Sequence, residues 1–196
     1  LYGVWARRYS KVKAFAERFS IPQAYESAEA MLADPSIDIV YIAVPNDIHH
    51  HYIMAALAAG KHVLCEKAIT TSGDELAEEL ALAKEKGLVL EEAMTIYNMP
   101  LYHRLKEIVA SGKLGKLKMI QAPFGSYKDP DPQNRFFNPD LGGGALLDIG
   151  TYAVSFARFF MSESPKVEFS SMKPFETGVD EQSVTILRNP ADEMAS

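Results

Sequence analysis

Hydrophobic and polar positions alternate in blocks along the first half of the chain. Residues 38–44 (DIVYIAV) form a nearly continuous apolar, β-branched run, which is typical of a strand covered on both faces in a parallel sheet. Shorter apolar runs predict strands at residues 1–6, 21–25, 62–65 and 88–93. Between these runs, apolar residues recur at helical spacing.

The helical segments fill the intervals between the strands. They are expected at residues 10–19, 27–33, 48–60 and 72–86. Ser10 is suited to cap the helix that follows it, and Ser72 with Glu75 makes a capping box. Strand and helix alternating with short connections is typical of right-handed βαβ units. Residues 1–93 are therefore predicted to form a doubly wound, parallel α/β domain.

The pattern changes in the second half of the chain. Its expected elements are a helix at 100–110, a long strand at 118–127, a loop rich in proline and aspartate, a helix at 145–160, and strands at 166–173 and 182–188. This order predicts an α+β domain over residues 94–196 with an open mixed or antiparallel sheet.

Composition narrows the classes of partner. Of 196 residues 47% are hydrophobic, enough for a sizeable core, and 20 basic against 26 acidic residues give a net charge of −6. Nucleic acid and membrane surfaces are therefore poor partners. Cys65, the single cysteine, cannot form an intrachain disulfide and fits a small buried hydrophobe. With no membrane span or secretion signal evident, we expect a cytoplasmic protein.

Both ends of the sequence look cut. The opening LYGVWARR has no initiator methionine and already lies in an apolar run, and the closing RNPADEMAS follows a strand-like segment. We expect a truncated sequence in which both domains are incomplete.

Candidate chemistry gathers where the predicted parallel strands end. Ligands bind open parallel sheets outside the carboxyl ends of the strands. The residues found there are Arg7, Arg8, Pro45, Asn46, His49, Glu66 and Lys67. A lysine at such an edge can place its ammonium against a substrate oxygen or lower the pKa of a neighbouring acid. A solvated sheet edge and an ordinary Pro-Asn turn are the alternatives.

The second domain contributes the stretch GGGALLDIGTY. Gly142, Gly143 and Gly144 allow a sharp turn before a helix, and Asp148 and Tyr152 share one helix face at i and i+4. Tyr152 is a candidate proton donor or acceptor, and Asp148 a candidate for orienting a substrate hydroxyl. Alternatively, Asp148 caps the helix and Tyr152 belongs to the core.

Two stretches of these residues resemble a known family. Residues 43–70 (AVPNDIHHHYIMAALAAGKHVLCEKAIT) and 142–154 (GGGALLDIGTYAV) are similar to segments of the Gfo/Idh/MocA family of nicotinamide-dependent oxidoreductases, and the element order agrees over nearly the whole chain. The resemblance implies a Rossmann-like domain followed by a domain whose open sheet often forms a dimer interface. Members oxidise or reduce sugars, cyclitols and related diols.

The resemblance also implies roles for individual residues. Lys67 would touch the nicotinamide ribose and the substrate, Asp148 would bind substrate, and His49 would lie near the cofactor. Tyr152 stands where many members have a catalytic histidine. Tyrosine there, together with DPQNR at residues 131–135, is similar to the branch of the dihydrodiol dehydrogenases and glucose-fructose oxidoreductase.

The chain departs from the family in two places. Ala68 replaces the usual proline after the lysine, which removes a fixed φ and should loosen the loop more than it affects the chemistry. The family's first strand and its G-x-G-x-x-G turn are expected to precede Leu1, and the triple glycine does not replace them because it follows no strand of a βαβ unit.

Cofactor choice depends on the end of the first visible strand. An NAD site usually has Asp or Glu there, whereas arginine suits the additional phosphate of NADP. Arg7 and Arg8 therefore favour NADP, with NAD still possible; the alternative is that both arginines only solvate the edge. No metal site is expected, since His49, His50 and His51 point in different directions on one helix.

Arg135 has two interpretations, a contact with a substrate hydroxyl and a structural salt bridge. The predicted function is hydride transfer between nicotinamide and a secondary alcohol of a sugar, cyclitol or cyclic diol. In it Tyr152 exchanges the hydroxyl proton, and Lys67 lowers the barrier electrostatically. A catalytically silent, ligand-sensing protein of the same fold is the alternative. The sequence leaves the substrate, the physiological direction and the oligomeric state open.

Overall fold

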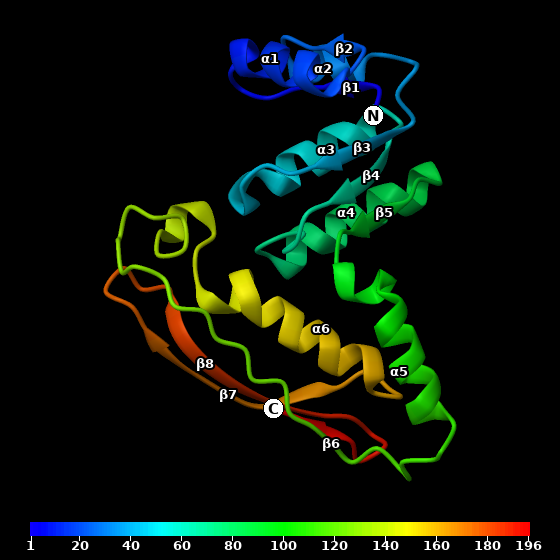
Figure 1. Ribbon diagram of the computed structural model, residues 1–196, viewed down its shortest axis with the longest axis vertical. Helices are drawn as coiled ribbons and strands as arrows, with labels where there is room; N and C mark the ends of the chain where they lie inside the picture. The colour runs from blue at the N-terminus through cyan, green and yellow to red at the C-terminus, as the bar shows by residue number, and fades with distance from the viewer. The chain divides into compact units, whose positions relative to one another are not determined.

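The computed structural model describes residues 1–196 and divides into two compact units (Figure 1). The first comprises residues 1–44 and 48–92, and the second comprises residues 45–47 and 93–196. Each unit is described by itself. None of the helices is both long and apolar enough to cross a membrane.

The first unit alternates strands and helices. Its elements are β1 (Gly3–Val4), α1 (Tyr9–Phe19), β2 (Gln23–Ala24), α2 (Ala28–Leu32), β3 (Ile39–Ile42), η1 (Asn46–Ile48), α3 (His49–Ala58), β4 (His62–Cys65), α4 (Gly73–Lys86) and β5 (Leu90–Glu92). β3, β4 and β5 form a parallel sheet in that order, and β1 pairs with β2 in a second parallel sheet. The predicted α/β class is confirmed.

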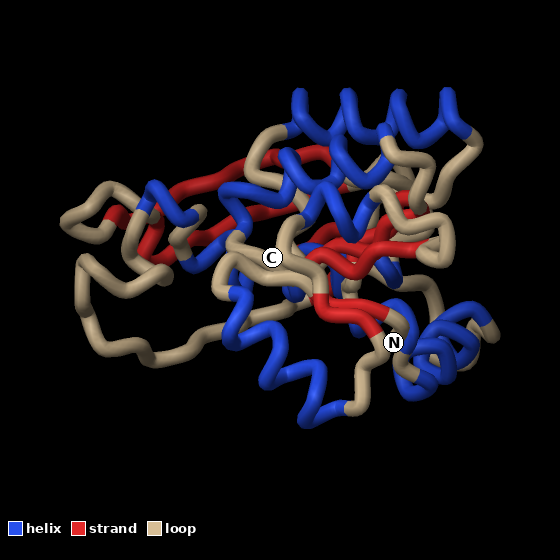
Figure 2. Tube along the Cα trace, turned by 90° about the horizontal axis from the view of Figure 1, so that it is seen from above, coloured by secondary structure: helices blue, strands red, loops and turns tan.

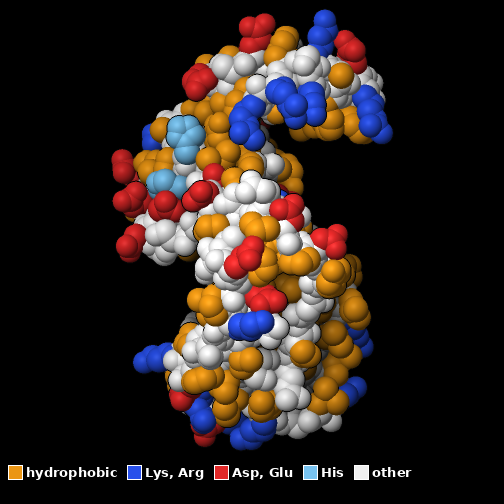
Figure 3. All heavy atoms as spheres, turned by 90° about the vertical axis from the view of Figure 1, so that its left-hand side faces the viewer, with side chains coloured by type: hydrophobic (Ala, Val, Ile, Leu, Met, Phe, Trp, Pro, Cys, Tyr) orange, Lys and Arg blue, Asp and Glu red, His pale blue; other side chains and the backbone are white.

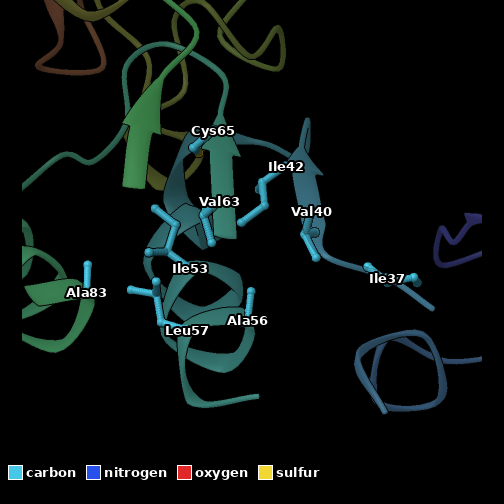
Figure 4. Close-up of a cluster of buried hydrophobic side chains, with 9 residues drawn as sticks. All are labelled: Ile37, Val40, Ile42, Ile53, Ala56, Leu57, Val63, Cys65 and Ala83. Atoms are coloured by element: carbon cyan, nitrogen blue, oxygen red, sulfur yellow. The ribbon is translucent and has the colours of Figure 1, made fainter. Parts of the chain in front are cut away.

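A hydrophobic core packs the three-stranded sheet against the helices α3 and α4. Side chains from β3 and β4 point toward α3 (Figure 4). Ile53 and Leu57 of α3 are fully buried, as is Cys65 at the end of β4. Alternate residues of β3 are exposed, including Ile39 and Tyr41, so this strand buries one face only. The expectation that residues 38–44 are covered on both faces is wrong for the chain described.

Serine side chains cap two helices of the first unit, at Ser27 and at the predicted position Ser72. The Ser27 hydroxyl accepts from the Ala30 amide at 3.1 Å, and the Ser72 hydroxyl accepts from the Glu75 amide at 3.5 Å. Instead of returning to Ser72, the Glu75 carboxylate accepts a hydrogen bond from Thr70.

The predicted cap at Ser10 is wrong. The helix α1 begins at Tyr9 with Arg8 in the capping position, and Ser10 lies inside its first turn. The Arg8 carbonyl accepts from the Lys11 and Val12 amides, so the backbone starts the helix two residues earlier than a serine cap at Ser10 would allow.

The second unit has a mixed sheet covered by a helix. Its elements are η2 (Thr95–Asn98), α5 (Pro100–Ala110), β6 (Met119–Ile120), η3 (Pro139–Leu141), η4 (Leu146–Gly150), α6 (Thr151–Phe160), β7 (Lys166–Pro174), β8 (Asp180–Arg188) and β9 (Met194–Ala195). The strand order is β6-β9-β8-β7, with β6 parallel to β9 and the other pairs antiparallel. The two long strands, β7 and β8, run side by side (Figure 2).

Two expectations for the second unit need correction. The strand predicted at 118–127 is paired only at Met119–Ile120, since Pro123 offers no amide hydrogen and Gly125 adds no side chain to pack. The helix predicted at 145–160 begins instead with a π-helical turn at η4 and becomes α-helical at Thr151.

The α6 helix and the sheet share an apolar core. Ala157 and Met161 of the helical segment pack with Ile120, Leu187 and Ala195. Apolar residues of β7 and β8 are also exposed, namely Val167, Phe169, Met172 and Val184.

Cys65 is expected to be chemically inert in the folded protein. Burial, followed by the fields of nearby glutamates, raises the pKa of its thiol to about 12. At pH 8 only on the order of one thiol in 10,000 would be the reactive thiolate. Iodoacetamide treatment of the intact protein followed by mass spectrometry of the Cys65 peptide should show labelling only after unfolding in urea. Labelling under native conditions would contradict this assignment.

Candidate functional site

The chain leaves the sheet of the first unit at neighbouring points after β3 and β4. Ile42 of β3 and Cys65 of β4 are register partners, and the amide of Glu66 donates to the Ile42 carbonyl at 2.8 Å. Beyond this bond, one strand continues into Pro45 and Asn46 and the other into Lys67. The register thus places these sequence-predicted residues on neighbouring strand ends.

Glu66 ties the chain segment after β4 to β3. One carboxylate oxygen accepts a hydrogen bond from the Tyr41 hydroxyl, which raises the pKa of Tyr41 to about 12. The other oxygen accepts from the Lys67 amide at 3.3 Å. Glu66 therefore holds the backbone of Lys67, a structural role that motif analysis did not assign.

Lys67 lies in a short segment anchored on both sides. Its side chain is half-buried, and the peptide bond to Ala68 is cis. Past Ala68, the Ile69 amide donates to Glu92, at the end of β5, at 2.9 Å. No short sequence pattern indicates this contact, because Glu92 is more than twenty residues away along the chain.

His49 is fully buried and its ring lies between the two loops. Its Nε2 is 2.9 Å from the Val44 carbonyl, which precedes Pro45. Its Nδ1 is 2.9 Å from the Ala68 carbonyl and 3.2 Å from the Ile69 carbonyl. The imidazole thus joins the end of β3 to the segment after β4.

Arg7 and Arg8 follow β1 and their side chains are exposed. Arg8 also occupies the capping position of α1. Two guanidinium groups at a strand end are available to an anionic ligand. No group of three or more His, Cys, Asp or Glu side chains is placed to hold a metal ion.

The backbone conformation at residues 142–144 requires glycine at each of the three positions. Gly142 has φ 68° and Gly144 has φ 117°. A Cβ on Gly143 would lie 2.7 Å, 2.8 Å and 2.9 Å from three backbone carbonyl oxygens, those of Asn138, Arg135 and Phe136. The predicted sharp turn is confirmed, and both unusual φ values and close backbone approach explain it.

Asp180 of β8 holds the start of the helix that follows this turn. Its Oδ2 accepts from the Leu146 amide at 2.7 Å, and a Cβ on Gly144 would lie 2.2 Å from its Oδ1. This carboxylate therefore replaces the serine or aspartate cap that a helix normally finds in its own sequence. Sequence analysis missed Asp180 because the contact spans more than thirty residues.

Asp148 and Tyr152 lie in the helical segment whose start Asp180 holds. Asp148 lies in the π-helical turn and Tyr152 in the first turn of α6. Such π-helical turns are frequent at functional sites. The ring of Phe124 stands edge-on to that of Tyr152, with centroids 6.1 Å apart.

Arg135 forms the salt bridge that was one of its two interpretations. Its Nη2 is 3.8 Å from Asp148 Oδ1, and its guanidinium stacks 4.1 Å from the centre of the Phe136 ring. Asp148 also borders a cavity of about 900 Å³ within the second unit, enclosed by residues 121–130, the η4–α6 segment and β8. The pair thus places a positive charge next to a carboxylate that borders open space.

Comparison with known proteins decides the family. Residues 1–94 match the group described as "Oxidoreductase family, NAD-binding Rossmann fold", and residues 102–196 match the "GFO/IDH/MocA C-terminal domain". The chain belongs to the Gfo/Idh/MocA family. This confirms the resemblance drawn from residues 43–70 and 142–154.

Several Gfo/Idh/MocA relatives are similar over nearly the whole chain. D-xylose 1-dehydrogenase (NADP(+)) 2 of Haloferax volcanii is 39% identical over 183 residues, covering 93% of this chain and 56% of the relative. The Homo sapiens trans-1,2-dihydrobenzene-1,2-diol dehydrogenase is 37% identical over 190 residues, covering 96% and 56%. The chain therefore spans little more than half the length of these relatives.

Solved structures share the fold. A 3-ketoreductase from Actinomadura kijaniata, in complex with NADP and TDP-benzene, superimposes with a TM-score of 0.84 at 29% identity, covering 100% of this chain and 60% of that chain. A levoglucosan dehydrogenase, in complex with NADH and levoglucosan, gives a TM-score of 0.87 over 99% and 56% of the chains. At 23% identity this second likeness concerns the fold alone.

Replacing Gly144 by alanine should destabilise the start of the helical segment that η4 and α6 form in this Gfo/Idh/MocA chain. The new Cβ would meet Asp180 at an unfavourable positive φ, so the free energy of unfolding should fall by about 1–3 kcal/mol. Denaturant unfolding of the intact protein measures this change. Gly125→Ala is the matched control, because its Cβ would meet nothing within 4 Å and no positive φ is involved. Equal stability of the two variants would refute the role given to Gly144.

Proposed function

We propose that the protein containing this chain is an NADP-dependent oxidoreductase acting on a secondary alcohol of a sugar, cyclitol or cyclic diol. The observation that carries the proposal is the joint presence of Lys67, Asp148 and Tyr152, within the two stretches that resemble the family's motifs, in a chain belonging to the Gfo/Idh/MocA family. Relatives named as a xylose dehydrogenase and dihydrodiol dehydrogenases support this substrate class.

The donor set at the strand ends of the first unit fits a nicotinamide dinucleotide. The Asn46 amide and the Lys67 ammonium are suited to ribose hydroxyls, and Pro45, Glu66 and His49 belong to the loops that carry them. When bound, the nicotinamide would supply the hydride acceptor or donor.

NADP is the proposed cofactor. Arg7 and Arg8 follow β1 with exposed guanidinium groups, which suit a 2′-phosphate better than a ribose hydroxyl. The words "NADP(+)" in the name of the xylose dehydrogenase and NADP bound to the 3-ketoreductase are consistent with this choice. NAD stays possible.

In alcohol oxidation, the Tyr152 hydroxyl group in its ionised form takes the proton of the substrate hydroxyl as the C–O bond becomes C=O. The positive charge of Lys67 stabilises negative charge on the substrate oxygen during this transfer. Asp148 accepts a hydrogen bond from a neighbouring substrate hydroxyl, and Arg135, 3.8 Å away, helps to orient the Asp148 carboxylate. Reduction returns the same proton from Tyr152 to the carbonyl oxygen.

We further propose a homo-oligomer formed through the sheet of the second unit and a cytoplasmic location. The exposed apolar residues of β7 and β8 supply a surface suited to burial against a second copy. The acidic net charge of −6 makes nucleic acid and anionic membranes poor partners.

Conservative variants of the intact protein test the chemistry. Tyr152→Phe should lower kcat by roughly 10²–10⁴-fold, the range typical of a lost general acid or base, with NADPH affinity changed only a few-fold. Lys67→Met should lower kcat and weaken NADPH binding together. Steady-state kinetics with a panel of sugars and cyclic diols, together with NADPH fluorescence, measure both effects.

Tyr102→Phe is the matched control, because this tyrosine of α5 packs its ring on Phe156 and has no assigned role in the reaction. A Tyr152→Phe variant as active as Tyr102→Phe would eliminate the proposed proton transfer. Wild-type protein that quenches NADPH fluorescence but turns over no alcohol or ketone would favour the ligand-sensing alternative.

A further inference from the structure

We propose that His49 is a positioning residue that fastens the end of the chain segment after β3, at Val44, to the loop carrying Lys67, by donating hydrogen bonds from both ring nitrogens to backbone carbonyls. The inference rests on the proposed function for its catalytic consequence. Its structural content, a doubly protonated ring joining two strand ends, stands apart from any activity.

The contacts of His49 are unusual because every partner is an acceptor. Nε2 faces the Val44 carbonyl at 2.9 Å, and Nδ1 faces the carbonyls of Ala68 at 2.9 Å and Ile69 at 3.2 Å. A neutral imidazole carries one N–H and one lone pair, so one side of the ring would bring a lone pair against a carbonyl oxygen. The imidazolium form satisfies both sides.

The His49 ring joins the two chain segments just beyond the last backbone hydrogen bond between β3 and β4. The bond from the Glu66 amide to the Ile42 carbonyl is 2.8 Å long and joins the two chains at the end of the sheet. Past this point, Val44 and Ala68 are connected through the His49 ring. The side chain is fully buried, so water does not compete for these carbonyls.

Acidic groups on the neighbouring helix complement this charge. Glu79 of α4 is fully buried and its Oε1 lies 2.9 Å from Nδ1 of His50. Burial raises the pKa of the Glu79 carboxyl, while the hydrogen bond and charge of His50 and the charge of His49 oppose that rise. The Glu79 Oε2 atom is buried without a hydrogen-bond partner. A positive ring nearby offsets part of the cost of that carboxylate.

The adjacent histidines are arranged differently. His50 lies 3.8 Å from Glu78, and histidine side chains appear beside acidic ones on the surface (Figure 3). His51 is exposed and its ring stands edge-on to Tyr52. Three consecutive histidines thus have three environments, and His49 alone of the three bonds the loops after β3 and β4. His51 is therefore a matched control for substitutions at position 49.

Nitrogen-15 NMR of the imidazole rings in the intact protein tests the structural part directly. Both nitrogens of His49 should carry a hydrogen in the folded protein, each with a resolved one-bond N–H coupling. His49→Phe should shift the backbone amide signals of residues 46–48 and 66–69, whereas His51→Phe should leave them in place. Detection of a single protonated nitrogen, or unchanged loop signals in His49→Phe, would overturn the inference.

Kinetics test the catalytic part. His49→Phe should lower kcat by about 10–100-fold, the loss expected when a catalytic group is displaced by about 1 Å. His49→Gln, which can still donate to one loop, should recover part of that loss, and His51→Phe should retain wild-type kcat. Full activity in His49→Phe would contradict the positioning role.

The two arms separate this inference from the proposed function. Wild-type protein without turnover but with the expected imidazole signals would refute the enzyme proposal and leave the loop fastening intact. Should His49→Phe fail to fold, the wild-type spectrum and the His49→Gln variant still decide the question.

Discussion

Parallel pairing of β3 with β4 is the constraint on which the candidate chemistry of the first unit depends. The register that opposes Ile42 to Cys65 makes both chains leave the sheet at the same level, and the buried side chains of α3 hold that register in place. A shift of one residue would turn Val63 and Cys65 toward solvent, so apolar burial strongly disfavours alternatives. Loop positions at the strand ends are therefore a consequence of core packing.

Two carboxylates and one imidazole hydrogen-bond backbone groups beyond the ends of the strands, where the hydrogen bonds of the sheet stop. Glu66 accepts from the Lys67 amide, and Glu92 accepts from the Ile69 amide, so acidic side chains replace ladder partners after the strands end. Asp180 does the same for Leu146 in the second unit. Hydrogen bonds to ionised acceptors are stronger than neutral ones, which suits short loops with few contacts of their own. His49 provides the complementary donors, because its loops present carbonyls rather than amides.

The features that could be predicted from the sequence are those that local periodicity and helix capping determine. The strands of the first unit, the cap at Ser72 and the glycine turn before η4 all follow from residues close together in the chain. Ser10 was misassigned because a serine signal says nothing about how early the backbone can begin a helix. The strand predicted at 118–127 was too long because its apolar pattern was read through Pro123, which offers no amide hydrogen, and the structure pairs only Met119–Ile120.

The candidate site residues also divide into those that short sequence patterns indicate and those that depend on contacts between distant parts of the chain. Lys67, Asp148 and Tyr152 were predicted as candidates because they follow a strand end and a glycine turn, and their roles come from the family resemblance. Glu92 and Asp180 were not identified, because each acts on a backbone amide more than twenty residues away and no short pattern encodes that distance. His49 falls between these cases. Its position was found from the motif, but the sequence cannot state that its partners are all carbonyls, and that detail determines which form of the ring the fold requires.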